Sequence, residues 1–151
     1  MTIKFVGEHI AKLDDKGRLV FPSPLKALAE RAGVEKLRFV VSKNIFSKCL
    51  DILTYEEWEK ESESVKARLN SFNREHTAFW REHFRDCAIV EPDEKMGRIQ
   101  IPKHLLEKID IRKEVVFAGN YYKIELWAKE HYQDSKLSED EYINLAEKLL
   151  G

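Results

Sequence analysis

Asp14-Asp15-Lys16-Gly17-Arg18-Leu19-Val20-Phe21-Pro22 returns further along the chain as Glu94-Lys95-Met96-Gly97-Arg98-Ile99-Gln100-Ile101-Pro102, an offset of 80 positions from Gly17 to Gly97. A second matched block follows each copy: Cys49-Leu50-Asp51-Ile52 returns as Lys123-Ile124-Glu125-Leu126, at an offset of 74. Two matched blocks in the same order indicate duplication of one structural unit. An internal period of this kind predicts the architecture of the whole chain.

Each copy of the first block predicts a tight turn that presents an arginine. Gly17 and Gly97 can adopt a positive φ at no steric cost, so each can close a tight turn between two strands. The carboxylate three residues before each glycine, Asp14 or Glu94, is placed to accept hydrogen bonds from turn amides or from the arginine. The sequence therefore predicts two equivalent turns, each with its own carboxylate.

The residues after each glycine alternate in polarity, as in a half-buried strand. The apolar face is formed by Leu19, Phe21, Ile99 and Ile101. Arg18 and Arg98 lie on the opposite face, and Pro22 and Pro102 end the two strands, because proline cannot donate to a strand ladder. Both arginines are therefore predicted to face solvent beside a rigid turn, a geometry that suits contact with a repeated polyanion. An ion pair between Arg18 and Asp14 that only stabilises the turn is the alternative, and at this point both remain open.

These motifs resemble those of the MraZ family, bacterial transcriptional regulators built from two AbrB/SpoVT-type repeats. The resemblance covers roughly residues 5 to 132 and is carried by Leu13–Arg18 with Pro22, Cys49-Leu50 with Glu57-Trp58, and Gly97–Ile99 with Pro102. It implies an α+β fold with two pseudo-symmetric swapped-hairpin β-barrel repeats, a helical hairpin between them and a short C-terminal helix. The expected units are residues 5–54 and 87–132 for the repeats, 55–86 for the connecting hairpin and 133–151 for an acidic helical tail.

The resemblance also implies a function: a ring-like homo-oligomer that binds double-stranded DNA at short direct repeats upstream of division and cell-wall genes. The family's recognition motif, Asp-x-Lys-Gly-Arg, maps onto Asp14, Lys16, Gly17 and Arg18. Gly97 and Arg98 are the matching residues of the second repeat. In that repeat Glu94 replaces the aspartate and Met96 stands where Lys16 stands, so the second repeat is expected to contact DNA less strongly.

The charge distribution is more informative than the total charge. The 151 residues are 43% hydrophobic and 35% charged, as in an ordinary globular protein, and the net charge of −1 does not by itself favour a nucleic-acid partner. Basic residues gather around the first motif, at Lys4, Lys12, Lys16, Arg18 and Lys26. The segment from Lys129 onward is acidic. One copy is expected to bind DNA weakly and with strong salt sensitivity, whereas several copies in one assembly gain affinity through effective concentration.

Local patterns predict the elements within each repeat. In the first repeat we expect a strand over residues 5–13, its partner strand over 18–21, a helix from Pro24 that stops at Gly33, and strands over 37–41 and 49–53. In the second repeat we expect a helix over residues 103–109, a strand over 115–118, a turn at Gly119-Asn120 and a last strand over 122–127.

The segment between the repeats and the end of the chain are both predicted to be helical. Thr54 and Glu57 have the spacing of a helix cap, and the helix is expected to break near Asn70 or Ser71. A wide apolar surface follows, typical of a core or subunit contact, formed by Phe72, Phe79, Trp80, Phe84 and Cys87. Ser138 and Glu141 form a second capping box, followed by one apolar face of Tyr142, Leu145, Ala146 and Leu149. This last helix either covers a neighbouring surface or frays.

Nothing in the sequence favours an enzyme, a cofactor or a metal site. The glycines are isolated, so a phosphate-binding loop is not indicated. His76 and His83 are seven residues apart, whereas a helical zinc site uses closer spacing and further ligands. Cys49 and Cys87 are expected to be free, buried thiols, with a disulfide the less favoured interpretation.

The expected location is the cytoplasm, in association with the nucleoid, without a membrane partner or a small-molecule substrate. No segment approaches the ~20 apolar residues that span a bilayer, and Met1-Thr2-Ile3-Lys4 leads into a strand pattern rather than a signal peptide. The alternative function is an antitoxin-like protein-interaction module of the same fold. Such a module is expected to combine one repeat with a long partner-binding tail, whereas this chain has two repeats and a short tail.

Overall fold

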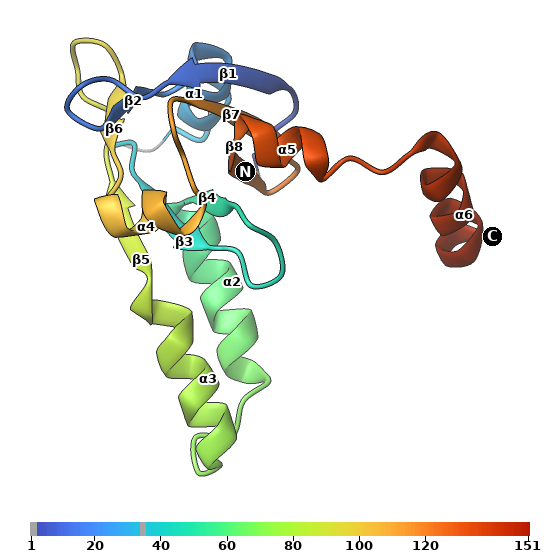
Figure 1. Cartoon of the computed structure of the whole chain (residues 1–151). Helices are drawn as coiled ribbons and strands as arrows, with labels where there is room; N and C mark the ends of the chain where they lie inside the picture. Colours follow the sequence, from blue (N-terminus) through green and yellow to red (C-terminus); the bar gives the residue numbers. More distant parts are fainter. Residues whose placement is uncertain (1–2, 34–35) are drawn as a thin grey trace.

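The computed structural model describes residues 3–33 and 36–151 and shows a mixed α+β fold, as predicted (Figure 1). The segment Met1–Lys4 was predicted to lead into a strand rather than to form a signal peptide. Its first two residues, Met1 and Thr2, lie outside the described residues. The elements follow the chain in the order β1 (Glu8–Lys12), β2 (Arg18–Val20), α1 (Ser23–Glu30), β3 (Phe39–Lys43), β4 (Leu50–Thr54), α2 (Tyr55–Ala67), α3 (Arg74–Arg85), β5 (Cys87–Val90), β6 (Arg98–Gln100), α4 (Lys103–Lys108), β7 (Glu114–Asn120), β8 (Lys123–Ala128), α5 (Lys129–Asp134) and α6 (Glu139–Leu150).

The strands form a six-stranded antiparallel sheet in the order β1-β7-β8-β4-β3-β5 and a separate two-stranded ribbon of β2 and β6. Both have a register that is unchanged when the two copies of the sequence are exchanged. In the ribbon Leu19 lies opposite Ile99, its counterpart at the offset of 80. In the large sheet Asp51 lies opposite Glu125, its counterpart at the offset of 74. The duplicated blocks therefore meet each other across a local pseudo-twofold axis, and neither block pairs with itself.

The pairing of the first two strands differs from the prediction. β1 was expected to pair with the strand that begins at Arg18, but it pairs with β7, and β2 pairs with β6. In the same way β5 pairs with β3. The first strand of each copy thus adds to the other copy's sheet. The physical reason is burial, because the short strands β2 and β6 cover Leu19 and Ile99 only by pairing with each other.

The second hairpin turn lies later than predicted. Gly119 and Asn120 belong to β7, and the turn is made by Tyr121 and Tyr122, with Tyr121 at a φ of 65°. Gly119 has a different role, because a Cβ at this position would come within 2.6 Å of the backbone nitrogen of Val6. The glycine therefore permits a close approach of two backbones rather than a turn. That approach is fixed by hydrogen bonds between Phe5 and Tyr121 in both directions.

The core lies between the large sheet, the ribbon and the helices α1 and α4. Phe21 stacks on Phe39 with ring centroids 4.6 Å apart and meets the edge of the Phe117 ring at 5.6 Å. Leu25 of α1 and Leu105 of α4 are fully buried against the same cluster. Burial of these side chains, each worth about 1.5–3 kcal/mol, holds the ribbon and its turns in place.

The connecting segment forms the predicted helical hairpin, which extends away from the sheets (Figure 1). Thr54 caps α2 by accepting a hydrogen bond from the amide of Glu57, and Asn73 caps α3. Aromatic rings then bind the two helices together, with Phe84 at the centre of a cluster that includes Trp58, Trp80 and His83. Two predicted members of the helical surface lie elsewhere: Phe72 is in the connecting loop, and Cys87 begins β5.

Both cysteines are free thiols in the structure. Cys49 is buried, as predicted, and burial raises the pKa of its thiol to about 12. Cys87 is only half-buried; its Sγ donates a hydrogen bond to the carbonyl of His83, and burial again raises the thiol pKa. Within residues 3–33 and 36–151, every helix is too short or too polar to cross a bilayer.

Candidate nucleic-acid interface

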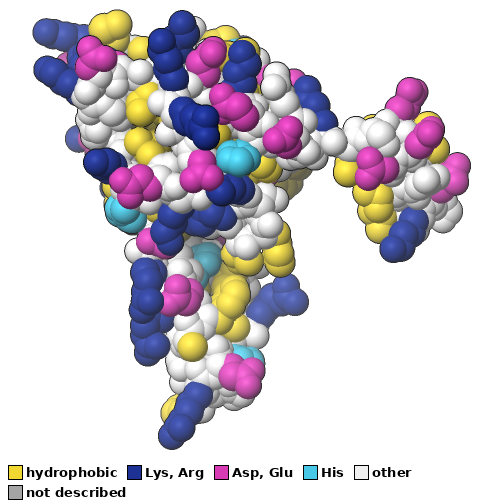
Figure 2. Space-filling view, viewed as in Figure 1, with side chains coloured by type: hydrophobic (Ala, Val, Ile, Leu, Met, Phe, Trp, Pro, Cys, Tyr) yellow, Lys and Arg dark blue, Asp and Glu magenta, His cyan; other side chains and the backbone are white. Residues whose placement is uncertain are grey.

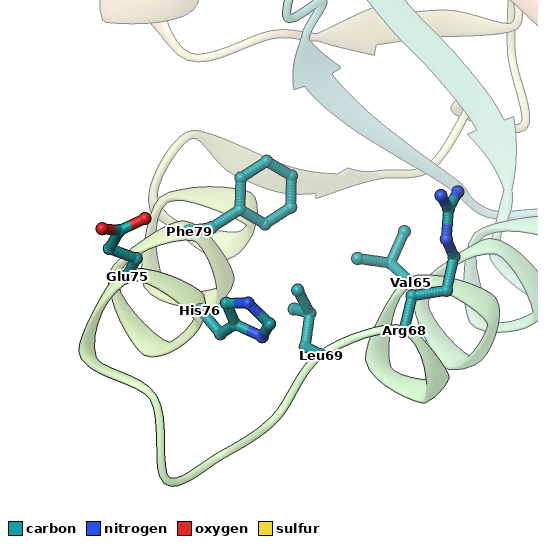
Figure 3. A pocket seen from close by; sticks show the side chains of 6 residues that line it. All are labelled: Val65, Arg68, Leu69, Glu75, His76 and Phe79. Carbon is teal, nitrogen blue, oxygen red and sulfur yellow. The ribbon is translucent and has the colours of Figure 1, made fainter.

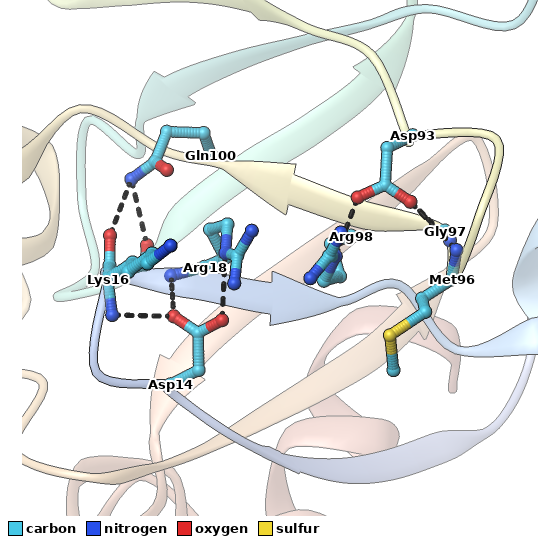
Figure 4. A network of polar contacts seen from close by, with 9 residues as sticks. Asp14, Lys16, Arg18, Asp93, Met96, Gly97, Arg98 and Gln100 are labelled. Atoms are coloured by element: carbon cyan, nitrogen blue, oxygen red, sulfur yellow. Dashed lines mark hydrogen bonds and ion pairs between the residues drawn. The ribbon is translucent and has the colours of Figure 1, made fainter.

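The first turn is closed around the carboxylate of Asp14 (Figure 4). Asp14 Oδ1 accepts hydrogen bonds from the amides of Lys16 at 2.9 Å and Arg18 at 2.8 Å, and Oδ2 accepts one from Arg18 Nε at 2.8 Å. Gly17 lies in the left-handed region, with a φ of 76°. These hydrogen bonds, above all the one from the Arg18 amide, lower the pKa of Asp14 below its usual 3.8. The carboxylate is therefore ionised in neutral solution and fixes the arginine.

The second turn uses the same chemistry with a different carboxylate from the one predicted. Asp93, and not Glu94, accepts hydrogen bonds from the amides of Met96 at 2.8 Å and Gly97 at 3.1 Å. Its Oδ2 accepts the hydrogen bond of Arg98 Nε at 2.6 Å. The Met96 amide and the Arg98 side chain hold the pKa of Asp93 well below its usual range. Glu94 is exposed and makes no ion pair with any residue that the structure describes.

This difference changes how the two turns are aligned. Counted from the carboxylate to the arginine, the second turn is one residue longer than the first, since Asp93 is five positions before Arg98. Lys95 then has the same place after the carboxylate as Lys16, and Met96 is the added residue. The second repeat therefore has a lysine two positions after its carboxylate, as the first has, although Met96 lies where Lys16 lies relative to the glycine and donates the matching amide hydrogen bond. The alignment counted back from the glycine selected Glu94 and did not reveal the extra residue. The tendency of aspartate to begin such turns is the sequence signal that could have identified Asp93.

The two arginines lie on one ribbon and are less exposed than predicted. Arg18 pairs with Gln100 and Arg98 pairs with Val20 across the ribbon, while Leu19 and Ile99 are buried beneath it. The exposed fractions of the side chains are 28% for Arg18 and 22% for Arg98, because each Nε folds back onto its carboxylate. The terminal Nη atoms make no hydrogen bond to any part of the chain that the structure describes. Each guanidinium is thus held by one edge and free at the other.

Gln100 connects β6 to the first turn and was not predicted as a site residue. Its Nε2 donates hydrogen bonds to the carbonyl of Gly17 at 3.1 Å and the carbonyl of Lys16 at 3.3 Å (Figure 4). The matching position in the first copy is Val20, which has no donor. The alternation of the strand places Gln100 on its outer face, but a local pattern could not show that the opposite turn lies within reach.

Further cations surround the turns without forming an uninterrupted basic surface. Lys26 of α1 leans toward the second turn, with Nζ 3.7 Å from the position that a Gly97 Cβ would occupy. Lys103 lines a cleft of about 400 Å³ beside the first turn, together with Lys16 and Gly17. Lys and Arg side chains are interspersed with carboxylates over the part of the surface seen in Figure 2. The local positive charge is therefore carried by individual side chains rather than by a broad patch.

One cluster near the pseudo-twofold axis has the composition of a metal site but is already occupied by protein partners. The ligating atoms of Cys49, Asp51 and Glu125 lie within 4.8 Å of one another. Lys123 pairs with Asp51 at 3.2 Å, and Trp127 Nε1 donates to Glu125 at 3.1 Å. Because the carboxylates have these partners and the thiol pKa is about 12, the cluster fits a structural polar network better than a metal centre.

Comparison with known proteins identifies the family. A family model described as "MraZ protein, putative antitoxin-like" matches residues 84–150. The chain is 32% identical to the transcriptional regulator MraZ of Bacteroides thetaiotaomicron, over 99% of this chain and 94% of the relative. It is 36% identical to the MraZ regulator of Bacteroides fragilis, over 85% of this chain and 79% of the relative. The corresponding figures for the MraZ regulator of Dictyoglomus thermophilum are 34%, 95% and 92%.

The chain belongs to the MraZ family. The resemblance first seen in the Gly-Arg motifs therefore extends over nearly all of the chain, including α6, which was expected to lie beyond it. The MraZ relatives are named as transcriptional regulators and not as enzymes.

Proposed function

We propose that this MraZ-family chain is a transcriptional regulator that binds double-stranded DNA through its two braced turns. The observation that carries the proposal is the paired geometry of Arg18 and Arg98. Each arginine has its Nε bound to an ionised aspartate and its Nη atoms free, on one two-stranded ribbon. A guanidinium held in this way retains the fork of donors that recognises phosphate or the edge of guanine, and it has less rotamer freedom left to lose on binding.

The proposed contacts have distinct roles. Arg18 and Arg98 reach bases or phosphates, and a two-stranded ribbon has the dimensions to enter the major groove. Lys16 contacts phosphate, and Asp14 positions Arg18. Gly17 and Gly97 supply the positive φ that closes the turns.

We further propose that the repeats are AbrB/SpoVT-like swapped hairpins and that several copies form a ring. The repeats comprise residues 5–54 and 87–132, joined by the hairpin of residues 55–86 and followed by the tail of residues 133–151. The exchange of β1 and β5 between the copies supports the first point. The net charge of −1 supports the second, since one copy has little general attraction for DNA, whereas a ring that presents many turns to direct repeats gains affinity through multivalency.

Electrophoretic mobility of DNA taken from upstream of the protein's own gene tests the DNA-binding proposal. The unmodified protein is expected to shift this DNA at lower concentration than a scrambled fragment. Arg18→Ala is expected to lose the shift while keeping its helical circular dichroism and its mass in light scattering. Lys60→Ala, which removes one exposed positive charge on α2, is the matched control and is expected to bind normally. Equal binding by Arg18→Ala and the unmodified protein would contradict the proposal.

A second candidate, an antitoxin-like interaction module, is favoured by the family description and by the exposed helix α6. This function predicts a different outcome in the same assay: no preference for the upstream DNA, and no effect of Arg18→Ala.

A further inference from the structure

Helix α6 is well formed at its start but packs against no other element among residues 3–33 and 36–151 of its own chain. Ser138 and Glu141 make the predicted capping box, with reciprocal hydrogen bonds of 3.1 Å. None of the 12 residues of α6 is buried, and the helix stands apart from the rest of the molecule (Figures 1 and 2). Isolated helices of this length are marginal in water, and most helical stability in proteins comes from packing an apolar face. The helix therefore lacks the contact that would stabilise it.

The apolar side of α6 is wide and exposed. Tyr142, Leu145 and Leu149 follow each other at helical spacing, with Ile143 and Leu150 beside them. The exposed fractions reach 71% at Leu149 and 88% at Leu150. At 100° per residue, Asn144 lies on the opposite side of the helix. An exposed apolar stripe of this form is typical of a helix that packs into a groove of a partner.

The helical hairpin of the same fold offers a groove with matching chemistry (Figure 3). Val65 of α2, Leu69 just beyond its end and Phe79 of α3 form its apolar walls. Its polar lining consists of Arg68, Glu75 and His76. Its volume is about 480 Å³, and Phe72, in the loop that closes this end of the hairpin, is 97% exposed. The groove is therefore both apolar and open to solvent.

The charges of the two surfaces are complementary. Helix α6 carries four acidic residues and one lysine. Residues 65–79, the end of the hairpin that contains every lining residue of the groove, carry three basic residues and one acidic one. Each of the two surfaces is self-repelling, whereas contact between them joins an acidic helix to a basic hairpin end. This complementarity favours helix α6, which every copy of the chain carries, as the occupant of the groove.

We infer that α6 of one copy packs into the α2–α3 groove of a second copy of this chain. A contact within one chain is disfavoured because only three residues connect α5 to the cap Ser138, a span of at most about 14 Å. The groove lies at the far end of the 13-residue helix α2, about 20 Å beyond the sheet. The contact is head-to-tail, so each copy gives one helix and receives another, and it closes into a ring where the rotation allows. This inference rests on the self-association proposed above and is independent of DNA binding.

Photo-crosslinking from the groove tests which segment fills it. Phe79 is replaced by the photoreactive p-benzoyl-phenylalanine, and the variant is mixed with unmodified protein labelled with nitrogen-15. The expected product joins residue 79 of the unlabelled chain to a labelled peptide from residues 139–150. Crosslinks to α6 of the same chain only, to another segment, or to no protein segment would each overturn the inference.

Complementation between two defective variants tests the direction of the contact. Leu145→Asp/Leu149→Asp disables the helix, and Leu69→Asp/Phe79→Asp disables the groove. Each is expected to raise the concentration for half-dissociation, measured by light scattering, by about tenfold or more. Asn144→Asp adds a charge to the outer side of α6 and is expected to leave assembly unchanged. A mixture of the two defective variants is expected to form one-to-one pairs, because one supplies the groove and the other the helix.

The outcomes separate this inference from the proposed function. Pairing of α6 with α6 would give no complementation and would overturn the inference while leaving the ring intact. A ring that persists unchanged in both variants would do the same. A strictly monomeric unmodified protein would overturn both the ring and the α6 contact, whereas specific DNA binding by that monomer would still support the role of the turns.

Discussion

The two arginine turns were built from one duplicated motif, yet they are held differently. In the first turn Arg18 lies four residues after its carboxylate, and Gln100 from the other copy donates to the turn from outside. In the second turn Arg98 lies five residues after Asp93, Met96 is 60% exposed, and Val20 stands where the supporting amide would be. Duplication thus fixed the pairing of an arginine with a carboxylate, while the surrounding support diverged.

The support of the two arginines differs in kind. In each turn the local sequence holds the arginine through the aspartate, and each turn is also held from across the ribbon. The first turn receives two hydrogen bonds from the Gln100 side chain, and the second receives one from the amide of Phe21, which donates to the Gly97 carbonyl at 2.9 Å. Because the Gln100 amide reaches two carbonyls of the first turn, this turn is expected to lose less conformational freedom on binding and to contribute more to DNA affinity than the second. Substitutions in the two turns and across the ribbon test this asymmetry.

The largest difference is expected between Arg18→Ala and Arg98→Ala. Removal of Arg18 is expected to weaken DNA binding by about 1–3 kcal/mol for each subunit on the DNA, which is the range for a bidentate base contact. Arg98→Ala is expected to have a smaller effect, and the double variant is expected to bind at the level of scrambled DNA. Fluorescence anisotropy with a labelled direct-repeat fragment measures all three. An equal or larger effect of Arg98→Ala would remove the asymmetry.

Replacement of the bracing carboxylates is expected to have the next largest effect. Asp14→Asn and Asp93→Asn keep the size of the side chain and one oxygen that can accept hydrogen bonds from the backbone amides. They remove the negative charge that holds each Nε. Each is expected to weaken DNA binding less than removal of the corresponding arginine. Because a free arginine fork remains, high protein concentration is expected to restore binding. Binding isotherms of the two variants beside the arginine variants provide the measurement.

The same carboxylates predict a dependence on pH. Both pKa values are lowered from 3.8 on folding, so the two groups contribute their full stabilisation above about pH 4. The contribution is lost as the pH falls through the lowered values, at a lower pH for Asp93 than for Asp14. Carboxyl chemical shifts followed by NMR during acid titration are expected to show this order. Titration of either group at or above 3.8 would contradict the hydrogen bonding seen in that turn.

Exchange of the residues across the ribbon is expected to have a moderate effect and sharpens the comparison directly. Gln100→Val removes the outside support of the first turn and is expected to weaken DNA binding by about 0.5–1.5 kcal/mol, the range for a neutral hydrogen bond. Hydrogen exchange at the amides of Lys16 and Gly17 is expected to become faster. Val20→Gln places an amide opposite Arg98 and is expected to slow exchange in the second turn. An unchanged exchange rate in Gln100→Val would show that the turn holds itself.

The smallest effects are expected for the lysines, and here the two turns are expected to behave alike. Lys16→Ala removes the proposed phosphate contact of the first turn, and Lys95→Ala removes the lysine at the same distance from the carboxylate of the second. If both lysines contact phosphate, each substitution is expected to reduce the salt dependence of binding by about one unit of slope. The weakening is expected to be similar for specific and scrambled DNA. A normal salt slope for Lys95→Ala together with a reduced slope for Lys16→Ala would favour the alignment counted from the glycine, in which Met96 stands in place of Lys16.

Most of the helices and the positions of both turns followed from sequence, because their causes are local. Thr54 and Ser138 cap helices with residues three positions away, and Gly17 lacks the Cβ that would oppose its positive φ. The strand partners did not follow, since β1 and β2 are neighbours in sequence but pair with distant strands. Gly119 was mistaken for a turn residue because the backbone that approaches it comes from more than 100 residues away. The candidate site shows the same division, with Arg18 and Asp14 predicted and Gln100 missed.

By itself the sequence determined the duplication, the alternation that buries Leu19 and Ile99, and the presence of a carboxylate and an arginine in each turn. Only the tertiary structure decided which carboxylate binds Arg98, that Gln100 supports the opposite turn, and that no described residue outside α6 buries its apolar face. The physical reason is the range of the interactions. Turn and cap hydrogen bonds join residues that are only a few positions apart. Their residue pattern can therefore be recognised in a short stretch of sequence. Strand exchange and helix docking depend on burial of apolar surface between distant segments, and many pairings satisfy the same local pattern until the whole chain is packed.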